Sequence, residues 1–297
     1  MKLPSPCRDL PSLLTHVVLP SLSLVAFSIA RDVPRNVRDF YDTVRSQGSC
    51  SRKLVTSFYS SETGTNSFAY CGDHLDTQRV LYIQGRQGAL ANMDIDCDGR
   101  HGGVLDDGRC SASRSPDRQS TTAFRATIAG YDVPGVPDLN PYVHPYVVFG
   151  NTGRKPGWPN FDPTAYGIRP LSVMAVVCGD QLVYGVWGDM NGDDGPKPMV
   201  GEVSLSLATA CGGPRMSGSE GLDEEDVLYL AFVGYDAVPG AEGADWAAGN
   251  YAAFEKSIQA IGDQPVACVG SEAYRLVAYW GVVAIVAALA SFWAVLG

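Results

Sequence analysis

Two helical patterns of apolar residues stand near the two ends of the chain. The first follows Pro34, which is well placed to open a helix, and Gly48 is expected to end it. Its apolar face comprises Val37, Phe40, Tyr41 and Val44. The second pattern is expected to end at Gly262, and its apolar face comprises Trp246, Tyr251, Phe254, Ile258 and Ile261. A short helix is predicted between Phe124 and Ile128.

The segment between these helices has the patterns of β-strands. Apolar runs predict strands over 80–85, 89–98, 142–150, 171–179, 181–188 and 226–234. The densest pair, 171–179 and 181–188, is joined at Gly179-Asp180 and predicts a central hairpin. Helices at both ends with antiparallel strands between them predict an α+β fold: a single domain with a mainly antiparallel sheet and flanking helices.

The two ends of the sequence differ from its body. Residues 1–30 contain Lys2 and Arg8 before an apolar stretch, and small residues at Ser28 and Ala30 suit cleavage before Arg31, which predicts a secretory signal peptide. A catalytic domain is expected over 31–263. The remainder, 264–297, ends in an uncharged run of 22 residues from 276 to 297.

Cysteine usage indicates an oxidising compartment. Beyond the expected leader and before position 264 there are six cysteines, an even set that suits three disulfides. Their pairing cannot be read from the sequence, because six cysteines allow fifteen connectivities. Zinc is disfavoured since no Cys-x-x-Cys pair occurs. We therefore expect a secreted, extracellular protein with no metal and no cofactor.

The net charge of −10 narrows the possible partners. A strongly acidic protein repels nucleic acid and attracts cations, so no nucleic-acid partner is expected. We expect a monomer, with a membrane contact only if the apolar run is retained. Charge alone also fits the plain solubility of an extracellular protein.

The chemistry concentrates where the strand at 181–188 runs into an acidic, glycine-rich loop. Asp189 ends the strand and Glu202 begins the next element, so the two carboxyls can face one cleft. Glycoside hydrolysis needs such a pair, one protonated and one ionised. If strand alternation persists, Trp187 shares the face of Asp189 and offers a sugar platform, although a core tryptophan is equally expected there.

The same loop also has features of a calcium site. Asp189, Asn191 and Asp193 occupy alternate positions, as in loops that bind calcium through oxygen. The pattern then fails, because Asp194 stands where glycine is needed and Val200 where a bidentate glutamate is needed. A calcium-dependent extracellular carbohydrate-binding module without hydrolase activity remains the alternative function.

A second acidic stripe has a period of two. Asp94, Asp96 and Asp98 would share one face of a strand, with Ile95 and Cys97 on the other. A row of like charges costs stability unless a cation neutralises it. We expect these three aspartates, with Trp187, Asn191 and Asp193, to contact the substrate. A calcium loop or a solvated face are the competing interpretations.

The chain resembles the fungal chitosanases of glycoside hydrolase family 75. The resemblance covers approximately 32–262 and rests on long blocks at 40–42, 67–75, 88–99, 143–151, 171–179, 184–189, 200–202 and 226–229. It implies endo-hydrolysis of chitosan, a β-1,4-linked glucosamine polymer, with inversion at the anomeric carbon. The family's essential aspartate, in Trp-Gly-Asp, falls on Asp189 and its glutamate, in Val-Gly-Glu, on Glu202. The resemblance implies that Glu202 is the general acid and Asp189 the base that activates water.

The C-terminal end departs from that family, whose members end soon after a segment like 258–263. The run from Leu276 to Gly297 is long enough to span a bilayer. It also fits a lipid-anchor signal that would place the protein at the cell surface, or the translation of intron sequence in a faulty gene model. In each case the tail is expected to be extraneous to catalysis.

Overall fold

The computed structural model describes residues 31–112 and 118–271, so the expected leader and the apolar run at 276–297 lie outside the described residues. The strands are β1 (Arg31–Asp32), β2 (Lys53–Phe58), β3 (Phe68–Cys71), β4 (Val80–Gln84), β5 (Ala91–Asp96), β6 (Tyr146–Asn151), β7 (Val173–Cys178), β8 (Gln181–Asn191), β9 (Glu202–Ser204) and β10 (Leu222–Phe232). The helices are α1 (Arg35–Ser46), α2 (Leu75–Gln78), α3 (Arg125–Ala129), α4 (Leu205–Gly212) and α5 (Tyr251–Val266).

Six of the strands pair in a closed ring. The order β8-β6-β9-β5-β10 continues through β7, which pairs with both β10 and β8 and so closes the circuit into a barrel. Most pairings are antiparallel, and β5–β9 and β6–β8 are the parallel ones among the described strands. The predicted α+β class with a mainly antiparallel sheet is therefore confirmed.

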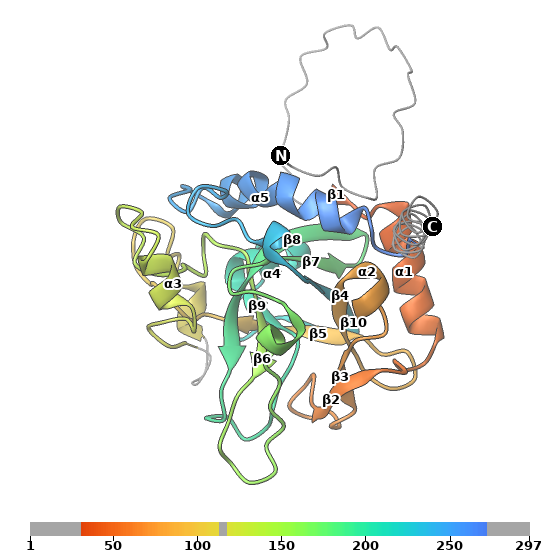
Figure 1. Ribbon diagram of the computed structural model, residues 1–297. Helices are drawn as coiled ribbons and strands as arrows, with labels where there is room; N and C mark the ends of the chain where they lie inside the picture. The colour runs from red at the N-terminus through yellow and green to blue at the C-terminus, as the bar shows by residue number, and fades with distance from the viewer. Residues whose placement is uncertain (1–30, 113–117, 272–297) are drawn as a thin grey trace, which may run out of the picture.

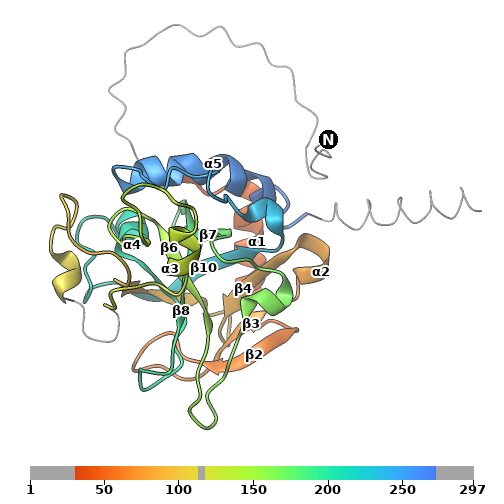
Figure 2. The same ribbon diagram turned by 60° about the vertical axis from the view of Figure 1, so that its left-hand side comes forward.

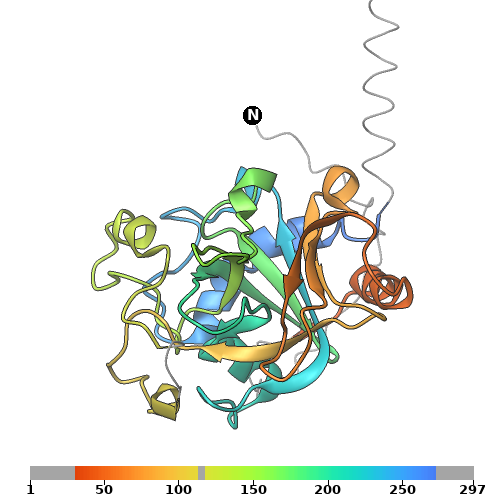
Figure 3. The same ribbon diagram turned by 90° about the horizontal axis from the view of Figure 1, so that it is seen from below.

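The second half of β10 carries the sheet beyond the barrel. It pairs with β4, and β3 and β2 follow in order. Figure 3 shows α1 and these outer strands on one side of the barrel and the long segment containing α3 on the other. Helix α5 lies across β7 and β8, at the top of the view in Figure 1.

The loops after β6 and β8 extend together, away from α5. Figures 1 and 2 both show them projecting from the side of the barrel opposite that helix. They are joined by hydrogen bonds from Thr152 N to Asn191 O, at 2.8 Å, and from Lys155 Nζ to Gly195 O, at 2.8 Å. These bonds tie together the loops beside the end of β8.

The predicted central hairpin is confirmed, and the predicted end of the last helix is wrong. Cys178 pairs with Gln181 across the two-residue turn between β7 and β8. Helix α5 continues past Gly262 to Val266. Gly262 packs on Tyr184 so closely that a Cβ would stand 2.8 Å from its ring, so this glycine permits close helix–sheet packing instead of ending the helix.

The six cysteines predicted to pair do form three disulfides. They join Cys50 to Cys71, Cys97 to Cys110 and Cys178 to Cys211. The packed domain also runs past the expected boundary at 263, because Val266 and Val269 are buried and their carbonyls accept hydrogen bonds from Asn36 Nδ2. Within the described residues, no helix has both the length and the apolar composition needed to cross a bilayer.

Candidate active site

Three of the predicted acidic residues lie in one row across four strands. Val148 on β6 pairs with Asp189 on β8 at one edge and with Glu202 on β9 at the other. Glu202 pairs in turn with Asp94 on β5. Residues that are paired across strands project from the same face of a sheet. The register therefore brings Asp189, Glu202 and Asp94 to one face, with Val148 between the first two.

A β-bulge at Gly188 aims Asp189 at this face. Trp187 pairs with Val147 and Asp189 with Val148, so Gly188 is the extra residue in β8. Consecutive residues of a strand point to opposite faces. Because Trp187 and Asp189 pair with consecutive residues of β6, the bulge puts their side chains on opposite faces of the sheet. The prediction that the two share a face assumed unbroken alternation and is corrected here.

Trp187 is consequently a core residue. Its side chain is 0% exposed, packs edge-on against Phe124 with ring centroids 4.7 Å apart, and donates from Nε1 to Asp189 O at 2.9 Å. A sugar can stack only on an exposed ring, so this indole does not provide the predicted platform. Its bond to the backbone of Asp189 instead holds the end of β8 in place.

Asp189 is a buried carboxyl with one unsatisfied oxygen. It is 5% exposed, and its Oδ1 accepts hydrogen bonds from Ala123 N at 2.9 Å and Met190 N at 2.7 Å. Its Oδ2 has no hydrogen-bond partner within the described part of the chain. Burial, and then the negative charge of Asp98, raise the pKa of Asp189 to about 8. This shift favours the protonated form of the carboxyl.

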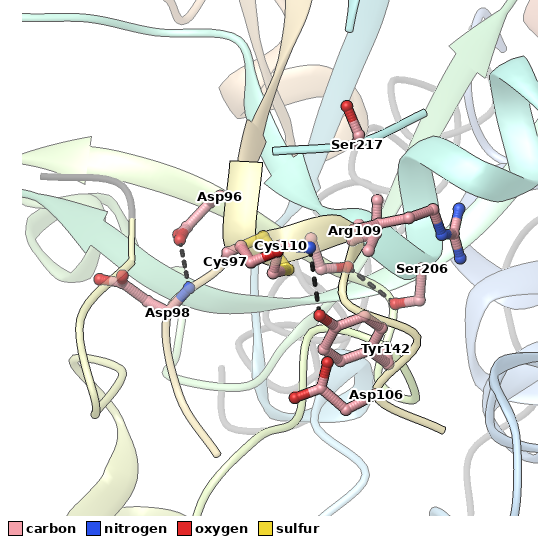
Figure 4. The surroundings of a disulfide bond; sticks show 12 residues. Asp96, Cys97, Asp98, Asp106, Arg109, Cys110, Tyr142, Ser206 and Ser217 are labelled. Carbon is pink, nitrogen blue, oxygen red and sulfur yellow. Dashed lines mark hydrogen bonds between the residues drawn. A yellow bond between two sulfur atoms is a disulfide. The ribbon is translucent and has the colours of Figure 1, made fainter. Parts of the chain in front are cut away.

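Asp96 and Asp98 lie beside Asp189 at the end of β5. One carboxylate oxygen from each of the three residues lies within 4.8 Å of the others. Asp96 Oδ1 accepts from Asp98 N at 2.7 Å, next to the Cys97–Cys110 disulfide that fixes this segment (Figure 4). Burial, and then the charge of Asp189, raise the pKa of Asp96 well above its usual range.

These carboxyls line a small cavity of about 30 Å³. Asp96, Asp98, Asp189 and Glu202 all contribute to its wall, together with Asn191 and Asp194. Asp96 is only 6% exposed, so this predicted substrate contact lies at the bottom of the site and not on an open face. Three carboxylates supply at most six oxygens, which is the lower end of the six to eight that calcium takes.

A larger cavity of about 670 Å³ lies next to the small one and shares Glu202 with it. Its acidic lining residues are Glu62, Asp94, Glu202, Glu220 and Asp223, and Lys197 is the basic one. Glu220 and Asp223 were not predicted as site residues, because only the pairing of Leu222 on β10 with Met93 on β5 brings them to this cavity. We refer to the two cavities together as the acidic groove.

The remaining predicted contacts differ in position. Asn191 lines the small cavity, and its Nδ2 donates to Met199 O at 3.0 Å. Asp193 Oδ2 accepts from the backbone N–H groups of Arg154 and Lys155, at 2.5 and 3.0 Å. Asp193 therefore anchors the neighbouring loop. The calcium-loop interpretation requires Asp193 and Asp189 to converge on one point, and they do not.

Comparisons with known proteins identify the family of the chain. Residues 93–268 match the family described as fungal chitosanase of glycosyl hydrolase group 75. The chain is 41% identical to an endo-chitosanase of Aspergillus fumigatus over 83% of its own length and 95% of that protein. It is 40% identical to endo-chitosanase B of Aspergillus oryzae, with the same coverage of 83% and 95%. The chain therefore belongs to the fungal chitosanases of glycosyl hydrolase group 75.

Proposed function

We propose that this protein is an extracellular endo-chitosanase that hydrolyses the β-1,4 linkages of chitosan with inversion, using Asp189 and Glu202. The observation that carries the proposal is their common pairing with Val148. Neighbouring strands lie about 4.8 Å apart, so the two backbones stand roughly 9.6 Å apart. Inverting enzymes place their carboxyls about 6.5 to 9.5 Å apart, which leaves room for a water molecule.

Asp94 is the competing partner for Glu202. It lies on the adjacent strand, at a backbone spacing of about 4.8 Å, which suits the closer carboxyl pair of a retaining enzyme. Its Oδ1 accepts a hydrogen bond from Asn92 Nδ2 at 3.1 Å. Asp189, in contrast, has a buried oxygen without a partner among the described residues, and such an oxygen can accept a proton from water. We therefore assign Asp94 to substrate binding.

The roles of the two carboxyls follow from their surroundings. Glu202 is half-buried where the two cavities meet, so it can reach the leaving oxygen of a sugar chain lying along the acidic groove. We assign it the general acid. Asp189 is the base that activates water, and it must be ionised to do so. A cationic substrate lowers the pKa of a nearby carboxyl, so binding of chitosan favours that ionised form.

The substrate follows from charge. Chitosan carries amines that are protonated in mildly acidic surroundings, and the acidic groove attracts them while giving no advantage to neutral glycans. The endo-chitosanases of Aspergillus similar to this chain support the same choice. The three disulfides support an extracellular location.

The test is digestion of chitosan by the purified protein, with proton NMR of the anomer released first. Inversion of a β-linkage releases the α-anomer first. Early β-anomer would indicate retention and would favour Asp94 over Asp189 as the partner of Glu202. Chitosan binding that EDTA abolishes, with no new reducing ends, would favour the calcium-dependent binding module. The absence of reducing ends in any buffer would reject the proposal.

A further inference from the structure

The small cavity of the acidic groove contains more carboxyl groups than two-carboxylate hydrolysis uses. Asp96 and Asp98 join the two assigned residues in its wall, and none of the described residues that line it is basic. About 30 Å³ holds a group the size of one or two water molecules. Buried carboxylates this close cannot all be ionised without a counter-charge, so the cluster retains protons when the groove is empty.

Hydrogen bonding determines where such a proton can reside. Asp189 Oδ1 and Asp96 Oδ1 both accept backbone N–H groups, which favours negative charge on those atoms. Asp98 accepts a hydrogen bond from Gln119 N. Asp189 Oδ2, which is buried and without a partner within the described residues, is the atom best placed to hold or exchange a proton.

We propose that Asp96 is a positioning residue for the base: it takes up the proton of Asp189 through water in the small cavity and holds that proton when Asp189 acts on the attacking water. The proposal rests on the function proposed above. In the reacting state Asp96 is neutral and Asp189 Oδ2 is ionised. Water gives one proton to Oδ2 as its oxygen bonds to the anomeric carbon. The glycosidic bond breaks, and Glu202 gives its proton to the leaving oxygen.

Other charged and titratable groups face the Asp96–Asp189 pair. They are Asp98 at the end of β5, Tyr146 on β6, Glu202 on β9, Asp138 in the loop before β6 and Asp194 in the loop after β8. Tyr146 donates from its hydroxyl to Asp98 O at 2.9 Å, and Asp138 accepts from Thr122 Oγ1 at 2.6 Å. Asp96 and Asp98 each have an oxygen within 4.8 Å of an Asp189 oxygen.

The test is the Asp96→Asn variant, whose Oδ1 can still accept from Asp98 N. The asparagine is neutral, as Asp96 is in the reacting state, but it cannot take up the proton of Asp189, which must then ionise alone. We expect the acid limb of the kcat profile, where the base becomes ionised, to move to higher pH by about one unit. The same chitosan is used for each variant, so titration of its amines cancels in the comparison. Glu242→Gln also removes one negative charge, from an exposed residue before α5, and should leave the acid limb unmoved.

The outcomes separate this inference from the proposed function. If Asp96 contacts substrate amines instead, Asp96→Asn raises KM and weakens the effect of salt while the acid limb of kcat stays in place, and the inference is rejected. A second measurement does not depend on activity. Unfolding followed at pH 8 should show Asp96→Asn to be more stable than the wild type, and equal or lower stability would contradict the inference. A wild type that releases no reducing ends would overturn the proposed function itself.

Discussion

Gly188 lies against Tyr146 so closely that a Cβ at Gly188 would stand 2.5 Å from the Cβ of Tyr146. The contact crosses from β8 to β6 at the β-bulge that aims Asp189 into the acidic groove. Only glycine fits there without moving backbone, because the obstructing atom is a Cβ and not the end of a flexible side chain. The orientation of Asp189 therefore depends on the residue before it.

The variant Gly188→Ala should lose both stability and activity. Overpacking of a filled core typically costs about 1–3 kcal/mol, and relief of the clash would displace Asp189. Urea unfolding and chitosan hydrolysis, measured on the same preparation, check both effects. Gly249→Ala is the matched control, since nothing lies within 4 Å of the Cβ built at Gly249. Wild-type turnover in Gly188→Ala would show that the bulge does not orient the base.

The variant Asp189→Asn should be less active and more stable. Loss of the base should lower kcat by about 10²- to 10⁴-fold. Burial raises the pKa of Asp189 to about 8, far above its value in the unfolded chain, so ionisation of this group opposes folding. The stabilising effect of Asp189→Asn should therefore be present at pH 8 and shrink as the pH falls towards 4. Urea unfolding across this pH range measures it.

Two results would contradict that prediction. Appreciable turnover by Asp189→Asn would reject Asp189 as the base. A stability difference that stays constant between pH 4 and pH 8 would reject the buried charge as its cause. Glu202→Gln provides the comparison for activity, because loss of the general acid should lower turnover to a similar extent.

Much of this site could be predicted from local sequence. The strand signal before Asp189 and the short Val-Gly-Glu segment at Glu202 place two carboxyls at strand ends, and β8 and β9 have them there. The alternation that predicted Asp94 and Asp96 on one face holds within β5. Local pattern is sufficient in these cases because each depends on only a few neighbouring residues.

The parts that failed depend on long-range contacts. The period of two assumed in β8 breaks at Gly188 because Tyr146, on another strand, leaves no room for a side chain. Gly262 is a helix-ending residue by local rules, yet here it packs on Tyr184. Asp223 reaches the acidic groove through the pairing of β10 with β5, two strands that are distant in sequence. None of these contacts has a signature in the segment where it acts.

His144 should make the protein less stable in mild acid. Its Nδ1 accepts from Asn140 N at 2.8 Å and its Nε2 bonds Trp246 O at 3.0 Å, so the ring is neutral and buried. Burial lowers its pKa from 6.5 to about 4. The unfolded chain therefore binds a proton before the folded one does. The contribution of His144 to stability is therefore kept above about pH 6.5 and falls towards pH 4, by up to about 1.4 kcal/mol per pH unit.

The variant His144→Gln tests this effect. It should be less stable than the wild type at pH 7, because two hydrogen bonds are disturbed, but its stability should fall less between pH 6.5 and pH 4. Urea unfolding at several pH values gives the two curves. Parallel curves for His144→Gln and the wild type would show that His144 is not responsible.

The larger cavity of the acidic groove should bind chitosan through charge. Asp94→Asn and Asp223→Asn each remove a negative charge from its lining, so KM for chitosan should rise several-fold at low ionic strength. Lys197→Gln removes the positive charge from the same wall and should lower KM. The differences should shrink in about 1 M salt, where charges are screened beyond about 3 Å. The aspartate variants and the lysine variant change the charge of one wall in opposite directions, so an electrostatic effect shifts KM in opposite directions. A general disturbance of the loops would instead raise KM in all three variants, and that result would contradict the electrostatic explanation.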